Sequence, residues 1–264
     1  MPELPEVEST REYLEAAVLS QPIEEVQVMD ERILFRTTPA GIGRCLAGKV
    51  FRSVYRYGKR LFLELEEDLW LTIHLGMTGR LIYLEKGEAE PAHIRLLIRF
   101  QNGCRLAFDD LRIFGEASLT ESPAAFLAEG KTGPDALLVD RDEFLRIMSG
   151  RRGAIKSHLL NQRLISGIGN LYADEALFQA GIHPRSRSLD EVQLARLFSI
   201  IQQVLRTSIS VRADFDRLPD SYLLRHRHPG GRCPRDGALL YHEKLGGRTS
   251  YYCPEHQRLV GSEK

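Results

Sequence analysis

The chain has 264 residues, which is enough for one large domain or two medium domains with cores of their own. Its 43% hydrophobic and 27% charged residues are typical of a globular protein and exclude a disordered or fibrous one. No apolar run reaches membrane-spanning length, and four cysteines are too few for a dense disulfide framework. We therefore expect a cytoplasmic protein with no membrane partner.

The formal net charge is zero, but the charges are unevenly distributed along the chain. Residues 151–264 carry more lysine and arginine than aspartate and glutamate, and residues 1–150 carry the opposite excess. A basic half is typical of a protein that binds phosphates on one side. Two domains that differ only in surface charge would show the same pattern, so it supports a nucleic-acid partner only weakly.

The spacing of apolar residues in the first half of the chain predicts one helix followed by strands. Leu4, Val7, Leu14 and Val18 share one face of a helix predicted over residues 5–19. From about residue 23 to residue 119 the pattern is that of strands, with the clearest alternation at residues 61–66. Further strands are predicted at residues 49–57, 69–75, 80–84, 93–100 and 104–108. Several short strands separated by turns indicate a β-sandwich.

The second half is predicted to be mostly helical. Residues 121–150 are expected to form a hinge and two short helices, with a break at residues 129–134. The segment from Ser188 to Glu191 has the pattern of a capping box, which predicts a long helix that continues to Val204. The C-terminal end of the chain is rich in glycine and aromatic residues, as a β-hairpin would be.

The sequence begins with Met1-Pro2-Glu3, which places a secondary amine beside a carboxylate. Removal of Met1 would leave Pro2 with a free α-amino group, which titrates at about pH 8 and is therefore partly nucleophilic at neutral pH. Such an amine can attack an electrophilic carbon and form an iminium ion, while Glu3 moves protons. Glu6 adds a second acid in the first helical turn. Alternatively, proline and glutamate are simply favoured where a helix begins.

Three turns in the strand region contain candidate binding residues. Lys59 follows a glycine in front of a strand, where a lysine is usually a solvated side chain. Met77 lies in the turn at residues 74–79, whose glycines allow a partner to approach the backbone closely. Arg112 and Phe114 lie in the segment 110–115. Each of these side chains could equally be an ordinary turn or core residue.

Residues 161–178 contain a Gly167-Ile168-Gly169 turn between two helices, with Asn170 where an N-cap belongs. Exposed N–H groups at a helix start, together with the positive end of the helix dipole, can bind a phosphate. A phosphate contact at Asn170 is therefore one interpretation of this turn. A plain corner between two helices is the alternative.

Near the C-terminus, Cys233, Asp236, Cys253 and His256 have the spacing of a zinc ribbon. Zinc accepts histidine readily and a carboxylate oxygen acceptably, so these residues are expected to hold one structural zinc ion. His226, His228 or His242 could take the place of Asp236. A hairpin held by packing without a metal is the alternative.

The segment Met1-Pro2-Glu3-Leu4-Pro5-Glu6-Val7-Glu8 resembles the start of the formamidopyrimidine-DNA glycosylase and endonuclease VIII family of base-excision repair enzymes, and the later segments follow in the family's order. The resemblance implies an α+β fold. Its parts would be an N-terminal β-sandwich domain with an N-terminal helix (1–120), a hinge (121–134), a helical helix–two-turn–helix domain (135–222) and a zinc-finger-like β-hairpin (223–264). It also implies a monomer that binds double-stranded DNA containing oxidised bases or abasic sites.

The resemblance implies a role for each matching residue. Pro2 would form a Schiff base with the damaged nucleotide, Glu3 would move protons, and Glu6 would lie beside them. The phosphate contacts would be Lys59, Lys156, Asn170 and Arg248, and the residues that fill the gap left by an everted base would be Met77, Arg112 and Phe114. The chain departs from the family at Leu111, where the family has proline, at Ile113, where it has arginine, and at the zinc positions Asp236 and His256.

The expected reaction is excision of oxidised purines, such as 8-oxoguanine and formamidopyrimidines, followed by strand cleavage by β,δ-elimination. The segment 110–115 favours purines, whereas the compact segment 212–231 leaves oxidised pyrimidines open. A damaged-DNA-binding protein without catalysis, or a general nucleic-acid-binding zinc ribbon, is the alternative from another functional class.

Overall fold

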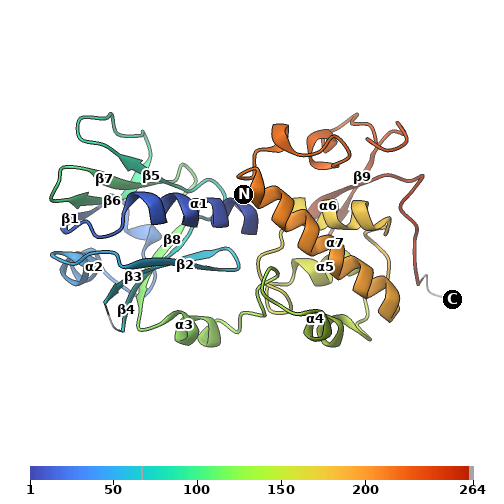
Figure 1. Cartoon of the computed structure of the whole chain (residues 1–264), viewed down its shortest axis with the longest axis horizontal. Coiled ribbons are helices and arrows are strands. Elements are labelled where there is room, and N and C mark those ends of the chain that lie inside the picture. The colour runs from blue at the N-terminus through green and yellow to red at the C-terminus, as the bar shows by residue number, and fades with distance from the viewer. Residues whose placement is uncertain (67, 262–264) are drawn as a thin grey trace. The chain divides into compact units, whose positions relative to one another are not determined.

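A computed structural model describes residues 1–66 and 68–261, and the chain forms two compact units (Figure 1). The first unit comprises Met1–Pro2 and Glu6–Lys131, and the second comprises Glu3–Pro5 and Thr132–Lys264. The last three residues of the expected hairpin domain, 262–264, lie outside the described residues. Within the described part of the chain, no helix is both long enough and apolar enough to cross a membrane.

Two antiparallel four-stranded sheets make up most of the first unit. The elements from the N-terminus to the start of the second unit are α1 (Leu4–Ala17), β1 (Ile23–Val28), η1 (Glu31–Ile33), α2 (Pro39–Leu46), β2 (Ser53–Tyr57), β3 (Arg60–Glu66), β4 (Leu69–His74), β5 (Arg80–Leu84), β6 (Ile94–Phe100), β7 (Arg105–Asp109), β8 (Glu116–Thr120) and α3 (Pro123–Glu129). The strand orders are β1-β6-β7-β5 and β2-β3-β4-β8. Apolar side chains of both sheets, including Leu63, Ile73 and Ile98, are buried in one cluster. The predicted β-sandwich is confirmed.

The predicted helix and strands of this half are present, but α2 is not predicted by the sequence pattern. The predicted apolar face is confirmed, because Leu4, Val7 and Leu14 of α1 are fully buried, as is Val18 directly after the helix. Helix α2 contains Gly41 and Gly43, which lower helix propensity. It begins because the Thr38 side chain accepts a hydrogen bond from the Gly41 N–H and Pro39 fits the first turn.

The second unit is helical and ends in a β-hairpin, as predicted. Its elements are α4 (Arg141–Met148), α5 (Ile155–Leu160), α6 (Asn170–Ala180), α7 (Glu191–Ser210), η2 (Phe215–Arg217), η3 (Leu224–His226), β9 (Tyr241–Leu245) and β10 (Arg248–Tyr252). A separate core cluster includes Tyr172 of α6 and Leu197 of α7. This core packs the helices that carry the residues of the candidate site.

The predicted start of α7 is wrong by two residues. Asp190 is the N-cap, and its side chain accepts the Gln193 N–H (2.8 Å) while the Gln193 side chain accepts the Asp190 N–H (3.0 Å). Ser188, which was expected to open the box, has a φ of +51° and lies outside the helix. The helix extends beyond Val204 to Ser210 because residues such as Leu205 continue its buried face.

A buried carboxylate on α6, Glu175, holds the segment that follows α7. Its Oε2 accepts the Leu224 N–H (2.9 Å), and its Oε1 accepts a hydrogen bond from Gln179 Nε2 (2.7 Å). Burial raises the pKa of Glu175 to about 7, against the opposing effect of these hydrogen bonds. The folded protein therefore favours the neutral acid more strongly than the unfolded chain does.

Replacing Glu175 with glutamine is expected to remove one pH-dependent contribution to stability. Since the folded-state pKa is raised, ionisation of this group destabilises the fold as pH rises from 4.5 to about 7 and has a constant effect above that. Over this interval the unfolding free energy of Glu175→Gln should rise relative to that of the wild type by up to about 3 kcal/mol. Urea unfolding at several pH values measures the difference, with Glu191→Gln as the exposed control. A constant difference would contradict the expectation.

Candidate active site and nucleic-acid interface

Glu3 is held at the N-terminus of helix α6. One carboxylate oxygen, Oε1, accepts the Leu171 N–H (2.9 Å), and Oε2 accepts the Tyr172 N–H (3.2 Å). The residue is only 1% exposed. Because the N-terminal end of a helix carries partial positive charge, this position stabilises the carboxylate anion. The acid that directly follows Pro2 is thus fixed by two backbone donors of one helix.

The Gly167-Ile168-Gly169 turn provides the space that the N-terminal residues occupy. Gly167 has a φ of +104°, and its carbonyl accepts the Leu4 N–H (3.1 Å). A Cβ atom on Gly169 would lie 2.2 Å from the Glu3 Cδ. The N–H groups of Leu171 and Tyr172 at this helix start therefore bind Glu3, and the phosphate contact predicted at Asn170 stays a prediction.

Asn170 is the first residue of α6, and Gly169, in an extended conformation, is the N-cap. The prediction that Asn170 is the N-cap is wrong by one residue. Its Nδ2 instead donates to the carbonyl of Thr249 (2.9 Å), and its Oδ1 is buried without a hydrogen-bond partner in the part of the chain that the structure describes. Asn170 is therefore tied to the residue that follows Arg248.

Arg248 is exposed at the tip of the C-terminal hairpin. Strands β9 and β10 are joined by Gly246 and Gly247, with φ values of +55° and +76°. Two successive positive φ values are typical of a type I′ turn, which a residue with a side chain adopts only at a cost. The tight turn places Arg248 as the first residue of β10, where its guanidinium group can reach a partner.

Lys156 is buried rather than available to a partner. It is 0% exposed, its Nζ lies 2.5 Å from Asp174 Oδ1, and it donates to Ser250 Oγ (2.6 Å). A phosphate cannot reach this ammonium group in the observed structure. The phosphate contact expected at Lys156 is contradicted by its position, which is that of an internal cation.

In the first unit, Lys59 lies in the two-residue turn between β2 and β3. Gly58 has a φ of +57°, as the first residue of such a turn requires. Arg56 supports the turn from beneath, because it donates to the Gly58 carbonyl (3.1 Å) and to Glu8 Oε2 (2.5 Å). Although burial raises the pKa of Glu8, its hydrogen bonds with Arg11 and Arg56 lower that pKa below the ordinary value. The turn that carries Lys59 is thus anchored to α1.

His74, at the end of β4, was not singled out by sequence reasoning. Its Nδ1 accepts the Gly76 N–H (3.0 Å), which leaves the proton on Nε2. Burial and the positive charges of Arg60 and Lys59 lower the pKa of His74 to about 4. The ring is therefore neutral at physiological pH and carries one N–H donor. The sequence signal was a histidine at the end of a predicted strand, directly before a glycine-bracketed turn.

Met77 and Phe114 lie in two loops that pack against each other. A Cβ atom on Gly76, which has a φ of +63°, would lie 2.3 Å from the backbone carbon of Phe114, so the loops touch only because residue 76 is glycine. Met77 is 38% exposed and Phe114 is 54% exposed. The two loops together present apolar side chains to solvent.

Buried Asp110 fixes the shape of the second of these loops. Its Oδ1 accepts a hydrogen bond from Thr78 Oγ1 (2.5 Å), and its Oδ2 accepts the Gly115 N–H (2.7 Å). The Arg112 guanidinium lies 4.9 Å from the centre of the Phe114 ring. Ile113, one of the two departures from the family motif, adopts a φ of +56° and packs against the core. The departure therefore leaves Arg112 and Phe114 on the surface.

The other expected residues of the N-terminus are half-buried. Pro2 directly precedes Glu3, so that its amine lies one residue from the carboxylate held by α6. Glu6 is in the first turn of α1, as predicted.

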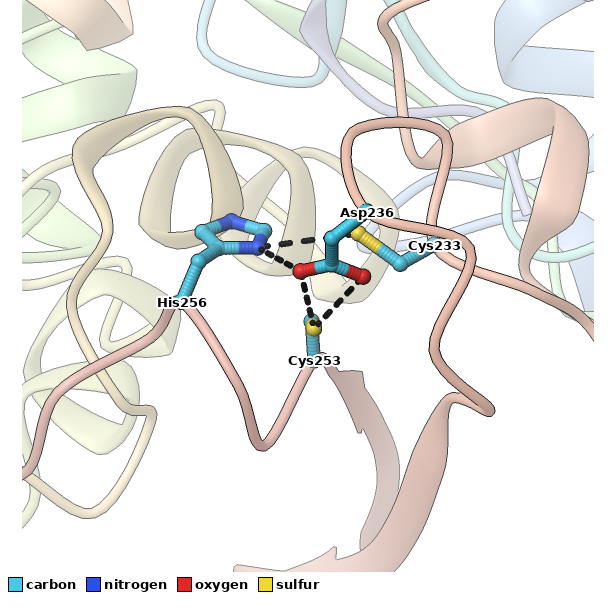
Figure 2. Close-up of side chains that lie close together, drawn as sticks. All are labelled: Cys233, Asp236, Cys253 and His256. Atoms are coloured by element: carbon cyan, nitrogen blue, oxygen red, sulfur yellow. Dashed lines mark hydrogen bonds and ion pairs between the residues drawn. The ribbon is translucent and has the colours of Figure 1, made fainter.

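The four expected metal ligands lie together beside α6 (Figure 2). Their potential ligand atoms are all within 4.8 Å of one another, and they belong to Cys233, Asp236, Cys253 and His256. The Nε2 of His256 lies 3.2 Å from the Phe178 carbonyl, so an N–H there leaves the Nδ1 lone pair directed at the cluster. Two thiols, one imidazole and one carboxylate are a donor set that zinc accepts. The group could therefore hold a metal ion.

The alternative ligands named from the sequence are not part of this cluster. Among the described residues, the group includes none of His226, His228 and His242. His242 lies on the hairpin, and its ring stacks on Tyr251 with centroids 5.4 Å apart. Asp236 is thus the fourth candidate ligand in this structure.

Comparison with known proteins agrees with these observations. The profile of the formamidopyrimidine-DNA glycosylase N-terminal domain matches residues 1–117, and that of the formamidopyrimidine-DNA glycosylase H2TH domain matches residues 132–218. The formamidopyrimidine-DNA glycosylase of Pelotomaculum thermopropionicum is 34% identical over 275 residues, which cover 98% of this chain and 100% of that protein.

Two solved structures are similar along almost the entire chain. One is MutM in complex with DNA containing carbocyclic 8-oxo-G, and the other is the Lactococcus lactis formamidopyrimidine-DNA glycosylase bound non-covalently to DNA containing an AP site. Each has a TM-score of 0.87 and 29% identity, and covers 97% of this chain and 100% of its own. The N-terminal segment, the sandwich and the helical unit therefore identify the chain as a member of the formamidopyrimidine-DNA glycosylase family.

Proposed function

We propose that the protein is a bifunctional DNA glycosylase and AP lyase that removes oxidised purines from double-stranded DNA and cleaves the strand. The observation that carries the proposal is the carboxylate of Glu3, fixed by the N–H groups of Leu171 and Tyr172 one residue from Pro2. An amine and an immobilised acid in adjacent positions are the two groups that Schiff-base chemistry on a sugar requires. The proposed place of action is the cytoplasm.

The proposed reaction begins with the free amine of Pro2. Its nitrogen forms a bond to C1′ of the damaged nucleotide as the bond between C1′ and the base breaks, and the base leaves with a proton. Glu3 protonates the ring oxygen of the sugar, so that the ring opens and an iminium ion forms. Loss of a proton from C2′ then expels the 3′ phosphate, and a second elimination expels the 5′ phosphate.

The remaining candidate residues are proposed to hold the DNA. Lys59, Asn170 and Arg248 would bind phosphates, and the neutral ring of His74 adds an N–H donor close to Lys59. Everting a base leaves a gap in the duplex, and an apolar side chain that fills it offsets part of the unstacking cost. Met77 and Phe114 would fill this gap, with Arg112 hydrogen-bonded to the orphaned base.

Excision assays on defined duplexes test the function. The solved relatives were bound to DNA containing carbocyclic 8-oxo-G and an AP site, which supports a purine lesion as substrate. We expect faster release of 8-oxoguanine than of thymine glycol, measured opposite each of the four bases, together with cleavage of an abasic strand. A strong preference for thymine glycol would overturn the choice of substrate, and binding without cleavage would leave only a damaged-DNA-binding protein.

We also propose that the cluster of Cys233, Asp236, Cys253 and His256 holds one zinc ion with a structural role. Zinc bound there would link the two segments that flank the hairpin and so stabilise the hairpin. His256 is already oriented by the Phe178 carbonyl, and the Arg235 N–H points to the Cys233 sulfur (3.4 Å). Both contacts support a preformed site.

Substitution of Asp236 tests the proposed ligand set. Asp236→Ala is expected to lower the zinc content from about one ion per chain to a small fraction, because only three ligands remain. Asp236→Cys should keep the ion and slow its transfer to a chelating dye, since a thiolate is a stronger zinc ligand than a carboxylate. Atomic emission and dye competition measure both quantities. Full zinc content in Asp236→Ala would contradict the assignment.

A further inference from the structure

The buried cation Lys156 belongs to an ionic cluster that contacts strand β10. The cluster consists of Lys156 on α5, Asp174 on α6 and Arg227 after η3. The side chains of Lys156 and Asp174 are 0% exposed and that of Arg227 is 11% exposed. Arg227 lies 2.8 Å from Asp174 Oδ2, so that one carboxylate joins two cations. A cluster of this kind is not needed to close a helical core, because replacing buried ion pairs with apolar residues of similar volume is often neutral or stabilising.

Each member of the cluster holds a different one of three consecutive residues that follow Arg248. Arg227 donates to the Thr249 carbonyl (2.8 Å), Lys156 donates to Ser250 Oγ (2.6 Å), and Asp174 accepts the Tyr251 N–H (3.1 Å). Asn170 adds a second donor to the Thr249 carbonyl. The Arg227 guanidinium also lies 4.9 Å from the centre of the Tyr251 ring. The cluster thus bonds to each of the three residues of β10 that follow Arg248.

The contacts with the Thr249 carbonyl and the Tyr251 N–H fall on the edge of β10 that has no neighbouring strand among the described residues. In the two-stranded sheet, β10 pairs with β9 on one edge only. A two-stranded hairpin alone is marginally stable in water. Arg227, Asn170 and Asp174 take the place of a third strand, because they bond to the Thr249 carbonyl and the Tyr251 N–H, which such a strand would bond. Lys156 adds a bond to the Ser250 side chain.

Each buried charge in the cluster is stabilised by the opposite charges beside it. Burial raises the pKa of Asp174 and lowers that of Lys156, and their mutual attraction opposes both shifts. The carboxylate of Glu3 also attracts Lys156. Loss of the lysine charge would leave Asp174 with one cation in a buried position, and breaking one partner of a buried pair is strongly unfavourable.

We infer that Lys156, Asp174 and Arg227 are positioning residues that fix the hairpin tip so that Arg248 can grip a phosphate. The inference rests on the proposed function, in which Arg248 is that contact. The lysine acts on DNA through β10 rather than by touching it.

The test uses Lys156→Met, which keeps the length of the side chain and removes its charge, and Lys156→Arg, which restores the charge. Lys86→Met is the control for loss of an exposed lysine. Leu197→Ala, in the α7 core, is the control for a variant that is merely less stable. Three quantities are measured on each full-length protein: affinity for a duplex with an uncleavable abasic analogue, single-turnover cleavage at saturating enzyme, and hydrogen exchange of the Tyr251 amide, whose N–H is bonded to Asp174.

Lys156→Met is expected to weaken DNA binding at least about tenfold and to change the saturated cleavage rate by less than about threefold. Exchange of the Tyr251 amide should accelerate, whereas Leu197→Ala lowers the melting temperature without a comparable loss of affinity. In the Arg248→Ala background, adding Lys156→Met should change affinity by less than about twofold, because both variants remove the same contact. Lys156→Arg should recover most of the affinity.

Unchanged affinity and exchange in Lys156→Met would overturn the inference, as would a loss of affinity that multiplies with that of Arg248→Ala. Failure of the proposed function can be distinguished from failure of this inference. A wild-type protein that binds the abasic duplex but never cleaves it overturns the enzyme assignment, while the affinity and exchange measurements still decide the role of the cluster.

Discussion

Replacing Glu3 with glutamine is expected to slow base excision by about 10²- to 10⁴-fold, the range that general acid–base catalysis contributes. The amide cannot protonate the sugar ring. It also presents an N–H₂ group to one of the two N–H donors at the start of α6, so that either the Leu171 or the Tyr172 N–H loses its acceptor. Single-turnover excision of 8-oxoguanine measures the effect.

The control variant tests whether loss of another glutamate charge in α1 affects the rate. Glu15→Gln changes an exposed glutamate of α1 and should leave the rate unchanged. Affinity of Glu3→Gln for a duplex with an abasic analogue should stay within about threefold of the wild type, since the catalytic carboxylate is not a phosphate contact. If Glu3→Gln excises the base at the wild-type rate, the acid of the reaction lies elsewhere.

Blocking the Pro2 nitrogen is expected to abolish covalent trapping. A protein expressed with a removable N-terminal tag provides matched forms: with the tag in place the nitrogen is part of an amide and has no nucleophilic lone pair, and after cleavage at Pro2 the amine is free. We expect borohydride to trap the cleaved form on abasic DNA and to leave the tagged form untrapped, with strand cleavage lower by at least about a thousandfold.

Mass spectrometry of the N-terminus confirms which form is present, and binding of the uncleavable duplex shows whether the tag disturbs DNA binding. Equal trapping of both forms would place the nucleophile on another residue. Absence of trapping in both forms, with normal DNA binding, would favour the non-catalytic alternative.

Local sequence signals predicted most elements because the period of the apolar residues decides which face is buried. The alternation at residues 61–66 is enough to predict β3, whose inward side chains Leu61, Leu63 and Leu65 are buried. Helix α2 was not predicted because its two glycines reduce the local helical signal. Its formation depends on the Thr38 cap and on packing of Ile42 and Leu46. The predicted N-cap was wrong where two suitable residues lie close in the sequence, as Ser188 and Asp190 do.

The sequence predicted which residues belong to the candidate site but not which residues they contact. The motif at the N-terminus indicated Glu3, yet its partners lie in α6, far along the chain, and no local pattern connects them. Lys156 illustrates the same limit. The resemblance to the family indicated a phosphate contact for Lys156, and only the fold places Asp174 and Ser250 around it. The metal cluster was predictable because ligand spacing on two short segments is itself a local signal.

The membership of Glu3–Pro5 in the second unit has a consequence for truncated forms of the protein. A fragment that starts at Thr132 would lack the three residues that fill the space over Gly167 and Gly169. Its Leu171 and Tyr172 amides would have no anion, and the pocket left by Leu4 would admit water. We therefore expect the helical half alone to be less stable than the same residues within the full chain.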